Sequence, residues 1–108
     1  MNNGEIWFVE LPKSNGHEQS GLRPVIVINE VDAGMVLIIP FTSNIQALRY
    51  TSTIQVKPTK TNGLKENSIA LIFQLRAIDK KRLLEKVGTL EKEHQDQVNK
   101  VLKKILAL

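Results

Sequence analysis

The period of the apolar residues changes near residue 78, and this change constrains the fold of the 108-residue chain more than any other feature. Before it, apolar residues alternate with polar ones or form short continuous runs, and both patterns are typical of strands. After it, apolar residues recur three and four positions apart, as on one face of a helix. The sequence therefore predicts a small α+β domain, mainly β, in which helices follow an antiparallel sheet.

Five segments have the pattern of strands: residues 5–11, 24–29, 35–42, 51–57 and 68–75. The last of them is almost continuously apolar, which indicates a strand in the middle of the sheet. Pro40 interrupts the third segment and cannot donate a hydrogen bond to a neighbouring strand. We therefore expect a bulge or a bend at Pro40, which fits a strongly bent sheet or a small barrel.

Two helices are expected after Asp79, which can serve as the first N-cap. The stretch KKRLLEKVG predicts a short helix over residues 80–88 that ends at Gly88. Thr89 can then cap a second helix. The apolar stripe of this second helix consists of Leu90, Val98, Val101, Leu102, Ile105 and Leu106.

Length and composition indicate one domain over residues 1–108, since 42% hydrophobic residues suffice for one core but hardly for two. The absence of cysteine excludes disulfides, thiolate zinc sites and a cysteine nucleophile. The start, MNNGEIWF, lacks the pattern of a signal peptide, and no apolar run approaches the ~20 residues that span a bilayer. We therefore expect a soluble, cytoplasmic protein without membrane contact.

The chain is basic, with a formal net charge of +4. This charge favours an anionic partner such as a nucleic acid or an acidic protein segment. Many of the lysines and arginines lie near the C-terminus among glutamates and aspartates, however, and such a mixture is also typical of a solvated helix face.

A polar cluster precedes the second predicted strand in the stretch NGHEQSGLRPVIVI. Arg23 comes directly before Pro24, which favours an extended backbone and places the arginine at the start of the strand. Its guanidinium offers a fork of donors that matches a phosphate, although an arginine at such a position is also a common surface ion-pair partner. His17 and Glu18 can transfer a proton to or from a bound group, or they are ordinary loop residues.

The third predicted strand ends in PFTSN, which supplies two hydroxyls and an amide from Thr42, Ser43 and Asn44. These groups can hold phosphate oxygens or a ribose hydroxyl, or they form a hydroxyl-rich turn. The two histidines are far apart and the carboxylates are scattered, so the sequence contains no recognisable metal-ligand set. We expect neither a metal nor another cofactor.

Four stretches, in this order and at this spacing, resemble the MazF/PemK/Kid family of toxin endoribonucleases from type II toxin–antitoxin systems: GEIWFVEL, GHEQSGLRPVIVI, IPFTSN and FQLRAIDKKRL. The resemblance runs from Gly4 to about Leu84. It implies a strongly bent antiparallel sheet, an SH3-like barrel of the CcdB/MazF/Kid type, with a C-terminal helix, acting as a homodimer. It also implies sequence-selective, metal-independent cleavage of single-stranded RNA, mostly messenger RNA, and neutralisation by a cognate antitoxin with a disordered acidic segment.

The resemblance also assigns roles to residues, with Arg23 and Thr42 as the first catalytic candidates. In the implied reaction a ribose 2′-hydroxyl attacks its own phosphate, and the products are a 2′,3′-cyclic phosphate and a 5′-hydroxyl. Arg23 is always protonated and suits the developing negative charge. Proton transfer then falls to Glu18 or His17, and the sequence does not distinguish them. The implied RNA-binding residues are Gly21, Ser43, Asn44, Gln74 and Arg76.

The chain departs from the Kid-like branch at Phe73 and Leu71, where that branch has a carboxylate and an arginine, so its division of acid and base does not carry over. Gln74 and Arg76 do match, and they can equally tie the sheet to the helix. The segments 43–53 and 57–63 are the expected readers of RNA sequence.

Two other functions remain open from the sequence. A gyrase-binding toxin of the CcdB type would have the same fold, but such toxins end in a tryptophan-containing tip, and this chain ends in KKILAL. An inactive RNA-binding barrel would use aromatic residues to stack bases, and the chain has only one tyrosine and three phenylalanines for that purpose.

Overall fold

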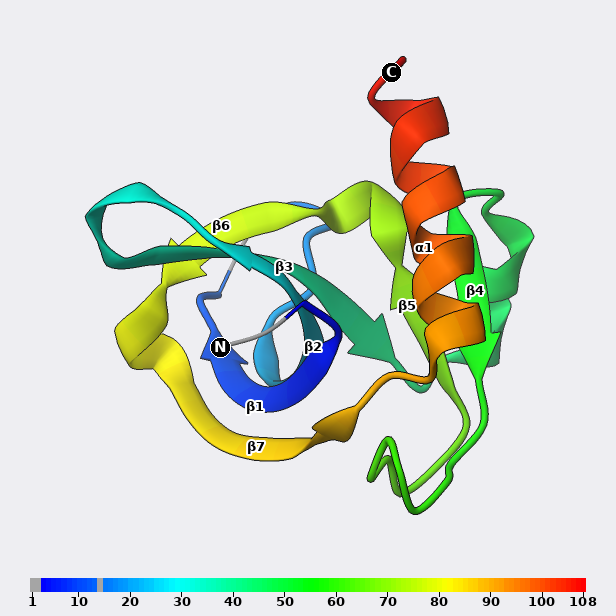
Figure 1. The fold of residues 1–108 in the computed structure, drawn as a ribbon, viewed down its shortest axis with the longest axis horizontal. Helices are drawn as coiled ribbons and strands as arrows, with labels where there is room; N and C mark the ends of the chain where they lie inside the picture. Colours follow the sequence, from blue (N-terminus) through cyan, green and yellow to red (C-terminus); the bar gives the residue numbers. More distant parts are fainter. Residues whose placement is uncertain (1–2, 14) are drawn as a thin grey trace.

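The computed structural model describes residues 3–13 and 15–108, which contain seven antiparallel strands, short 3₁₀ turns and a C-terminal α-helix (Figure 1). The strands pair in the order β4–β5–β3–β2–β1–β7, and β6 pairs with β3 as well. The predicted fold class is confirmed, with two more strands than the sequence indicated. The elements are β1 (Glu5–Leu11), β2 (Gly21–Glu30), β3 (Met35–Thr42), β4 (Thr53–Val56), β5 (Ser68–Leu71), β6 (Arg76–Asp79), β7 (Leu83–Thr89) and α1 (Lys92–Ile105).

The sheet is curled, because two of its distant strands are joined by a short connection. β6 pairs with β3 and β7 pairs with β1, while β2 lies between β3 and β1. In a flat sheet β6 and β7 would therefore be about 19 Å apart. The chain passes from Asp79 to Leu83 through one 3₁₀ turn, η4 (Lys80–Arg82), and four residue steps span at most about 14 Å. The strands must bend towards each other, as Figure 1 shows for β1, β2 and β7.

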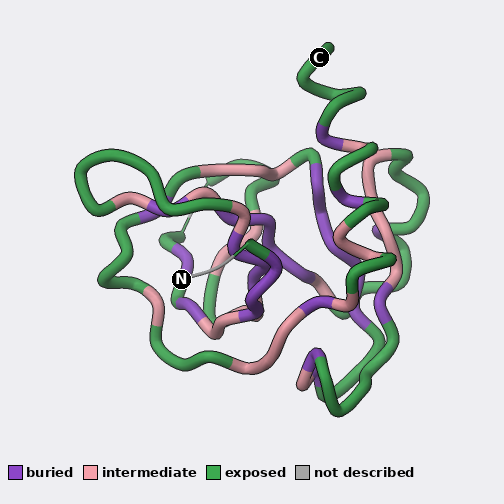
Figure 2. Tube along the Cα trace, viewed as in Figure 1, coloured by how far each residue is buried: buried purple, intermediate pink, exposed green. Residues whose placement is uncertain are grey.

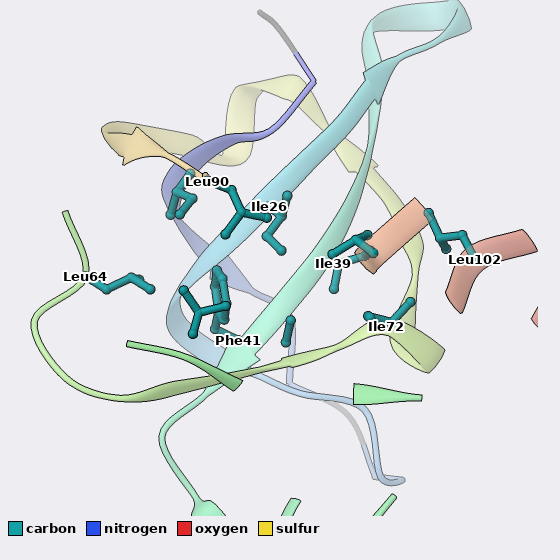
Figure 3. Close-up of a cluster of buried hydrophobic side chains, with 11 residues drawn as sticks. Ile26, Ile39, Phe41, Leu64, Ile72, Leu90 and Leu102 are labelled. Carbon is teal, nitrogen blue, oxygen red and sulfur yellow. The ribbon is translucent and has the colours of Figure 1, made fainter. Parts of the chain in front are cut away.

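The curl gives the sheet two buried faces, which explains why its strands are apolar on both sides. One face packs inside the curl: Val9, Leu11, Val25, Val27, Val36, Ile38 and Ile78. The other face packs against α1 and the loops: Ile6, Ile26, Ile39, Phe41, Val56, Leu64, Ala70, Ile72, Leu90, Val98 and Leu102. Figure 3 shows this second cluster, with Ile26 and Ile39 on neighbouring strands.

At Pro40 the structure shows a change of pairing partner. β3 pairs with β6 over residues 35–38 and with β5 over residues 41–42. Pro40 lies between these two pairings, where its missing N–H removes no bond to β5 or β6. The register shift of the β2–β3 ladder lies elsewhere, between Val27 and Asn29. The bulge is thus in β2, and β3 instead changes neighbours at the proline.

The predicted helix over residues 80–88 is wrong. Residues 83–89 form strand β7, which pairs with β1. Leucine, glutamate and lysine favour a helix locally, but this strand covers an edge of β1 that would otherwise lack a partner. Gly88 ends no helix: a Cβ there would lie 2.5 Å from backbone atoms of residues 61–62, so β7 needs glycine where the loop approaches it.

The C-terminal helix α1 begins at Lys92, and the predicted cap at Thr89 is wrong. Thr89 is the last residue of β7, and Glu91 takes the N-cap position. The expected apolar stripe is buried in its first part, at Leu90, Val98 and Leu102. Its last part, Ile105 and Leu106, is exposed, and Figure 2 shows the exposed end of α1. Neither α1 nor any other helix within residues 3–13 and 15–108 has the length and hydrophobicity of a membrane span.

Candidate active site

Arg23 lies near the start of β2, opposite Val9 of β1. Its side chain is half-buried, and its Nε donates a hydrogen bond to the carbonyl oxygen of Ser20 at 3.0 Å. This anchor uses one of the five N–H donors of the guanidinium, and the two terminal nitrogens carry the other four. The strand and the anchor thus fix the orientation of a fork that matches a phosphate.

Thr42 ends β3, and the next residues turn the chain into a 3₁₀ helix, η2 (Ile45–Arg49). The backbone N–H of Asn44 donates to Thr42 Oγ1 at 3.2 Å, and Asn44 Oδ1 accepts from the N–H of Gln46 at 3.0 Å and caps η2. The Thr42 hydroxyl accepts in this turn, so its own O–H is the group that can donate to a phosphate oxygen.

Arg23, Thr42 and Ser43 line one pocket of about 200 Å³, which we call the Arg23 pocket. It forms because β2 and β3 are antiparallel, which brings the start of one strand beside the end of the other. The loop between β4 and β5 closes the opposite side with Lys65 and Glu66. The pocket therefore joins three of the predicted site residues with an ammonium and a carboxylate that the sequence did not single out.

Asn62 anchors the loop that closes the Arg23 pocket. Its side chain is fully buried and makes four hydrogen bonds of 2.9 to 3.2 Å. Its oxygen accepts from the N–H groups of Thr59 and Leu64, and its nitrogen donates to the carbonyl of Lys57 and to Glu91 Oε1. The loop is thereby attached to the residue that precedes α1.

Glu91 receives a second bond, from the hydroxyl of Thr59 to Oε2 at 2.5 Å. Burial by itself raises the pKa of Glu91, but the hydrogen bonds from Thr59, from its own backbone N–H and from Asn62, together with the charge of His94, outweigh it. The pKa of Glu91 lies below its ordinary value, so the carboxylate is the favoured form.

His17, Thr42, Asn44 and Gln74 line a second pocket of about 460 Å³, which we call the His17 pocket. Thr42 belongs to both pockets and is the residue where they meet. Glu18 lines neither of them. It lines a third pocket, of about 330 Å³, together with His17, Gln74 and Arg76. The structure thus brings His17 closer than Glu18 to the surroundings of Thr42.

Gln74 and Arg76 hold the loop of residues 17–19 against the sheet. Gln74 Nε2 donates to the carbonyl of His17 at 3.0 Å, and Gln74 Oε1 accepts from the N–H of Gln19 at 2.7 Å. Arg76 Nη2 donates to the carbonyl of Gln19 at 2.6 Å. The two residues do form a structural tie, as one interpretation of the sequence allowed, but they tie a loop to the sheet rather than the sheet to the helix.

The Arg76 guanidinium is set deeper than that of a surface arginine, and its Nε is buried without a hydrogen-bond partner among the described residues. Burial lowers the pKa of Arg76, and the nearby carboxylate of Glu18 opposes the shift. The guanidinium stays protonated at neutral pH. Its charge is thus held next to Glu18 and under the loop that carries His17.

Gly21 begins β2 with a φ of +85°, and an added Cβ would meet nothing within 4 Å. The position therefore needs glycine for its backbone conformation and not for space. RNA contact by Gly21 stays a prediction. Across residues 3–13 and 15–108, no three histidine, aspartate or glutamate side chains are grouped so that they could hold a metal ion.

Sequence reasoning missed two residues that shape this region. Gln19 donates from Nε2 to the carbonyl of Phe41 at 3.3 Å, so it joins the 17–19 loop to β3. Asn62 appeared only as part of a loop expected to read RNA. An asparagine before glycine signals a turn, but nothing in the local sequence signals that its side chain is buried.

Comparison with known proteins shows to which family the chain belongs. Residues 2–106 match the model of the PemK-like, MazF-like toxin of type II toxin–antitoxin systems. The chain belongs to this family. The MazF-like toxin is also 34% identical over 110 residues to the endoribonuclease EndoA of Bacillus subtilis, a match that covers 97% of this chain and 93% of EndoA. It is therefore a MazF-like endoribonuclease toxin, and the matches support neither the gyrase-binding nor the inactive alternative.

Two solved structures share the fold of this MazF-like toxin. The crystal structure of MazF from Deinococcus radiodurans has a TM-score of 0.82 at 21% identity and covers 100% of this chain and 97% of its own. A MazE–MazF complex from the same organism has a TM-score of 0.75 at 21% identity, with coverage of 100% and 96%. Homologues of the MazF-like toxin are thus known in complex with their antitoxin.

Proposed function

We propose that this MazF-like toxin cleaves single-stranded RNA, above all messenger RNA in the cytoplasm, at selected sequences and without a metal ion or other cofactor. The Arg23 pocket carries this proposal. In it a cation anchored on a strand and a hydroxyl at the end of the neighbouring strand line the same space. A phosphate bound there receives charged donors from Arg23 and a neutral donor from Thr42.

The proposed reaction is attack of a ribose 2′-hydroxyl on the adjacent phosphorus. The bond from phosphorus to the 5′-oxygen of the next nucleotide breaks, which leaves a 2′,3′-cyclic phosphate and a 5′-hydroxyl. Negative charge on the phosphoryl oxygens grows in the transition state, and the terminal nitrogens of Arg23 stabilise it. Thr42, supported by Ser43, orients the phosphate.

Two proton transfers are needed: the 2′-hydroxyl loses a proton and the leaving 5′-oxygen gains one. His17 shares a pocket with Thr42, whereas Glu18 lies in the pocket of Arg76. This placement supports His17 as the first candidate and gives Glu18 the task of keeping Arg76 and the loop in position. Replacing His17 with alanine should then change the pH profile of kcat more than replacing Glu18 with glutamine.

The decisive experiment incubates the purified full chain with a mixture of natural RNAs in EDTA and maps the new ends by sequencing. We expect cuts at a short recurring sequence, with a 2′,3′-cyclic phosphate on one fragment and a 5′-hydroxyl on the other. An RNA with a single 2′-deoxy sugar just 5′ of the cut phosphate should bind and resist cleavage. Efficient cleavage of that RNA would overturn the mechanism, and complete inhibition by EDTA would overturn metal independence.

We also propose a homodimer and a cognate antitoxin with a disordered acidic segment as partners. The net charge of +4 suits such a segment, and a site that accepts phosphates also accepts carboxylates. The antitoxin peptide should therefore compete with RNA. Binding of the peptide at saturation without any loss of cleavage would show that the two sites do not overlap.

A further inference from the structure

The His17 pocket has an aromatic side. Tyr50 and Phe73 come from different parts of the chain, and their rings meet there with centroids 5.3 Å apart and planes tilted by 60°. Tyr50 follows η2, and Phe73 lies in the 3₁₀ helix η3 (Ile72–Gln74). Both residues line the same pocket as Thr42.

Both residues are exposed, Tyr50 at 44% and Phe73 at 43%. Aromatic residues are enriched at binding surfaces, and two exposed rings beside a polar pocket offer a flat apolar face to a ligand. The core does not need them, because the ring of Phe41 and a set of aliphatic side chains fill it.

Arg49 fixes the Tyr50 ring from one side. Its guanidinium carbon lies 4.8 Å from the ring centroid, and its Nη2 donates to the tyrosine hydroxyl at 2.8 Å. The ring is thus held by a cation at one face and by Phe73 at its side, so little rotamer freedom is left to lose when a ligand binds. The positive charge also suits a polyanion.

The remaining lining of the pocket can read a base edge. Asn44 uses its side-chain oxygen to cap η2, and the amide nitrogen is the atom that can still donate to a ligand. Gln19 and His17 stand beside it. The pocket volume of about 460 Å³ lies within the usual range for small-ligand sites.

We propose that Tyr50 and Phe73 form a stacking site for one unpaired nucleobase of the RNA whose scissile phosphate binds at Thr42. The inference rests on the proposed function and adds to it the position of a base. Single-stranded RNA presents such bases, and proteins recurrently bind them by stacking on aromatic rings. Because Thr42 lines both pockets, a strand can place its phosphate in the Arg23 pocket and a neighbouring base in the His17 pocket.

The test uses steady-state cleavage of a short RNA that contains one mapped cut site. Tyr50→Leu and Phe73→Leu remove the flat ring and keep apolar bulk, whereas Tyr50→Phe keeps the ring and removes the hydroxyl. The matched control is Val31→Ala, since Val31 is apolar, is 38% exposed and lines neither the Arg23 pocket nor the His17 pocket. Thermal unfolding of each variant checks that the fold is kept.

We expect Tyr50→Leu and Phe73→Leu to raise KM by about five- to a hundredfold, the scale for losing one base stack, while kcat changes by less than about threefold. Tyr50→Phe and the control should stay near wild type. A second series of RNAs carries one abasic site at each position around the cut. At one position, the abasic site should raise KM for the wild type. The same abasic RNA and the intact RNA should have equal KM values for Tyr50→Leu.

Failure of the inference is distinguishable from failure of the proposed function. If the wild type cuts no RNA, the proposed function fails and the stacking site fails with it. If the wild type cuts normally and neither leucine variant changes KM, only the stacking site is wrong. It is also wrong if the abasic site raises KM equally for the wild type and for Tyr50→Leu. A third contradicting result is that the leucine variants bind an antitoxin peptide more weakly while their KM for RNA is unchanged.

Discussion

The Arg23 side chain is anchored by one nitrogen and can contact a phosphate with the other two. Its Nε is bonded to the carbonyl of Ser20, and β2 holds its backbone, so the guanidinium cannot swing freely as a surface arginine does. The terminal nitrogens, which make the paired contact with a phosphate, take no part in that anchor. On the neighbouring strand, the Thr42 hydroxyl accepts from the N–H of Asn44 in a turn, which leaves its own O–H to donate. Preorganised donors of this kind stabilise a transition state without having to reorganise during the reaction.

Arg23→Ala should lower kcat/KM for a cleavable RNA by about 100-fold or more, the scale for losing one transition-state donor. Arg23→Lys should recover little of this loss, since an ammonium keeps the charge but lacks the fork and the Nε that bonds Ser20. Cleavage of an end-labelled RNA under single-turnover conditions measures the effect. Circular dichroism should show an unchanged fold, and full activity of the lysine variant would show that charge alone is sufficient.

At the scale of elements, the two pockets are lined by two loops that distant residues hold in place. The loop of residues 17–19 is held by Gln74 and Arg76, from η3 and β6. The loop between β4 and β5 is held by Asn62 and by Glu91 just before α1. One loop carries His17, and the other closes the Arg23 pocket. The two pockets are therefore shaped by contacts that no single strand contains.

Gln74→Ala should loosen the 17–19 loop, because it removes the acceptor of the Gln19 N–H and the donor to the His17 carbonyl. We expect faster hydrogen exchange at the Gln19 amide and a fall in kcat of roughly tenfold, with a change in unfolding free energy of about 1 kcal/mol. Gln74→Glu keeps the acceptor and should protect that amide. The control is Gln97→Ala on the exposed part of α1, and equal exchange in all variants would contradict the tie.

The link between the β4–β5 loop and α1 should depend on pH through Glu91. Its pKa is lower in the folded protein than the ordinary value of 4.5, so it stabilises the fold above that value and stops doing so as the pH falls through the folded pKa. In urea unfolding, Glu91→Gln should therefore be less stable than the wild type at pH 7, with the difference shrinking below about pH 4. Glu93→Gln is the matched control, and a difference that stays constant down to pH 3 would exclude this link.

For the whole molecule, the curl of the sheet determines where the pockets are. It brings β6 and β7, which pair with β3 and β1, towards each other and leaves the start of β2 and the end of β3 open between two loops. Several large apolar side chains are exposed, among them Leu22 at 60%, Leu84 at 59% and Leu106 at 50%. Association of two chains can bury apolar side chains that one chain alone leaves exposed to water.

We expect the purified protein to be a homodimer, with light scattering at micromolar concentration giving twice the chain mass of 12.2 kDa. Burial of exposed leucines between two copies supplies the driving force. Because this force is apolar, the dimer should persist in 0.5 M salt, while RNA binding should weaken steeply with salt. A monomeric mass together with full cleavage would contradict the dimer.

Much of the fold could be read from the sequence, because strand and helix periods are local properties. The predicted strands at residues 5–11 and 35–42 match β1 and β3. The error at β7 has a local cause too, since residues 83–89 have helix-forming side chains, and only the edge of β1 makes them a strand. Local pattern indicates what a segment can form, and the neighbouring strand decides what it does form.

The sequence by itself determined that the chain is a mainly β protein with a C-terminal helix, and that Arg23 lies on a strand and Thr42 in a hydroxyl-rich turn. Only the tertiary structure decided that Thr42 lies between two pockets, that Gln74 holds a loop, and that Tyr50 meets Phe73. These contacts join residues far apart along the chain, and they depend on how tightly the sheet curls. The curl is a property of all the strands together, so no stretch of sequence contains it.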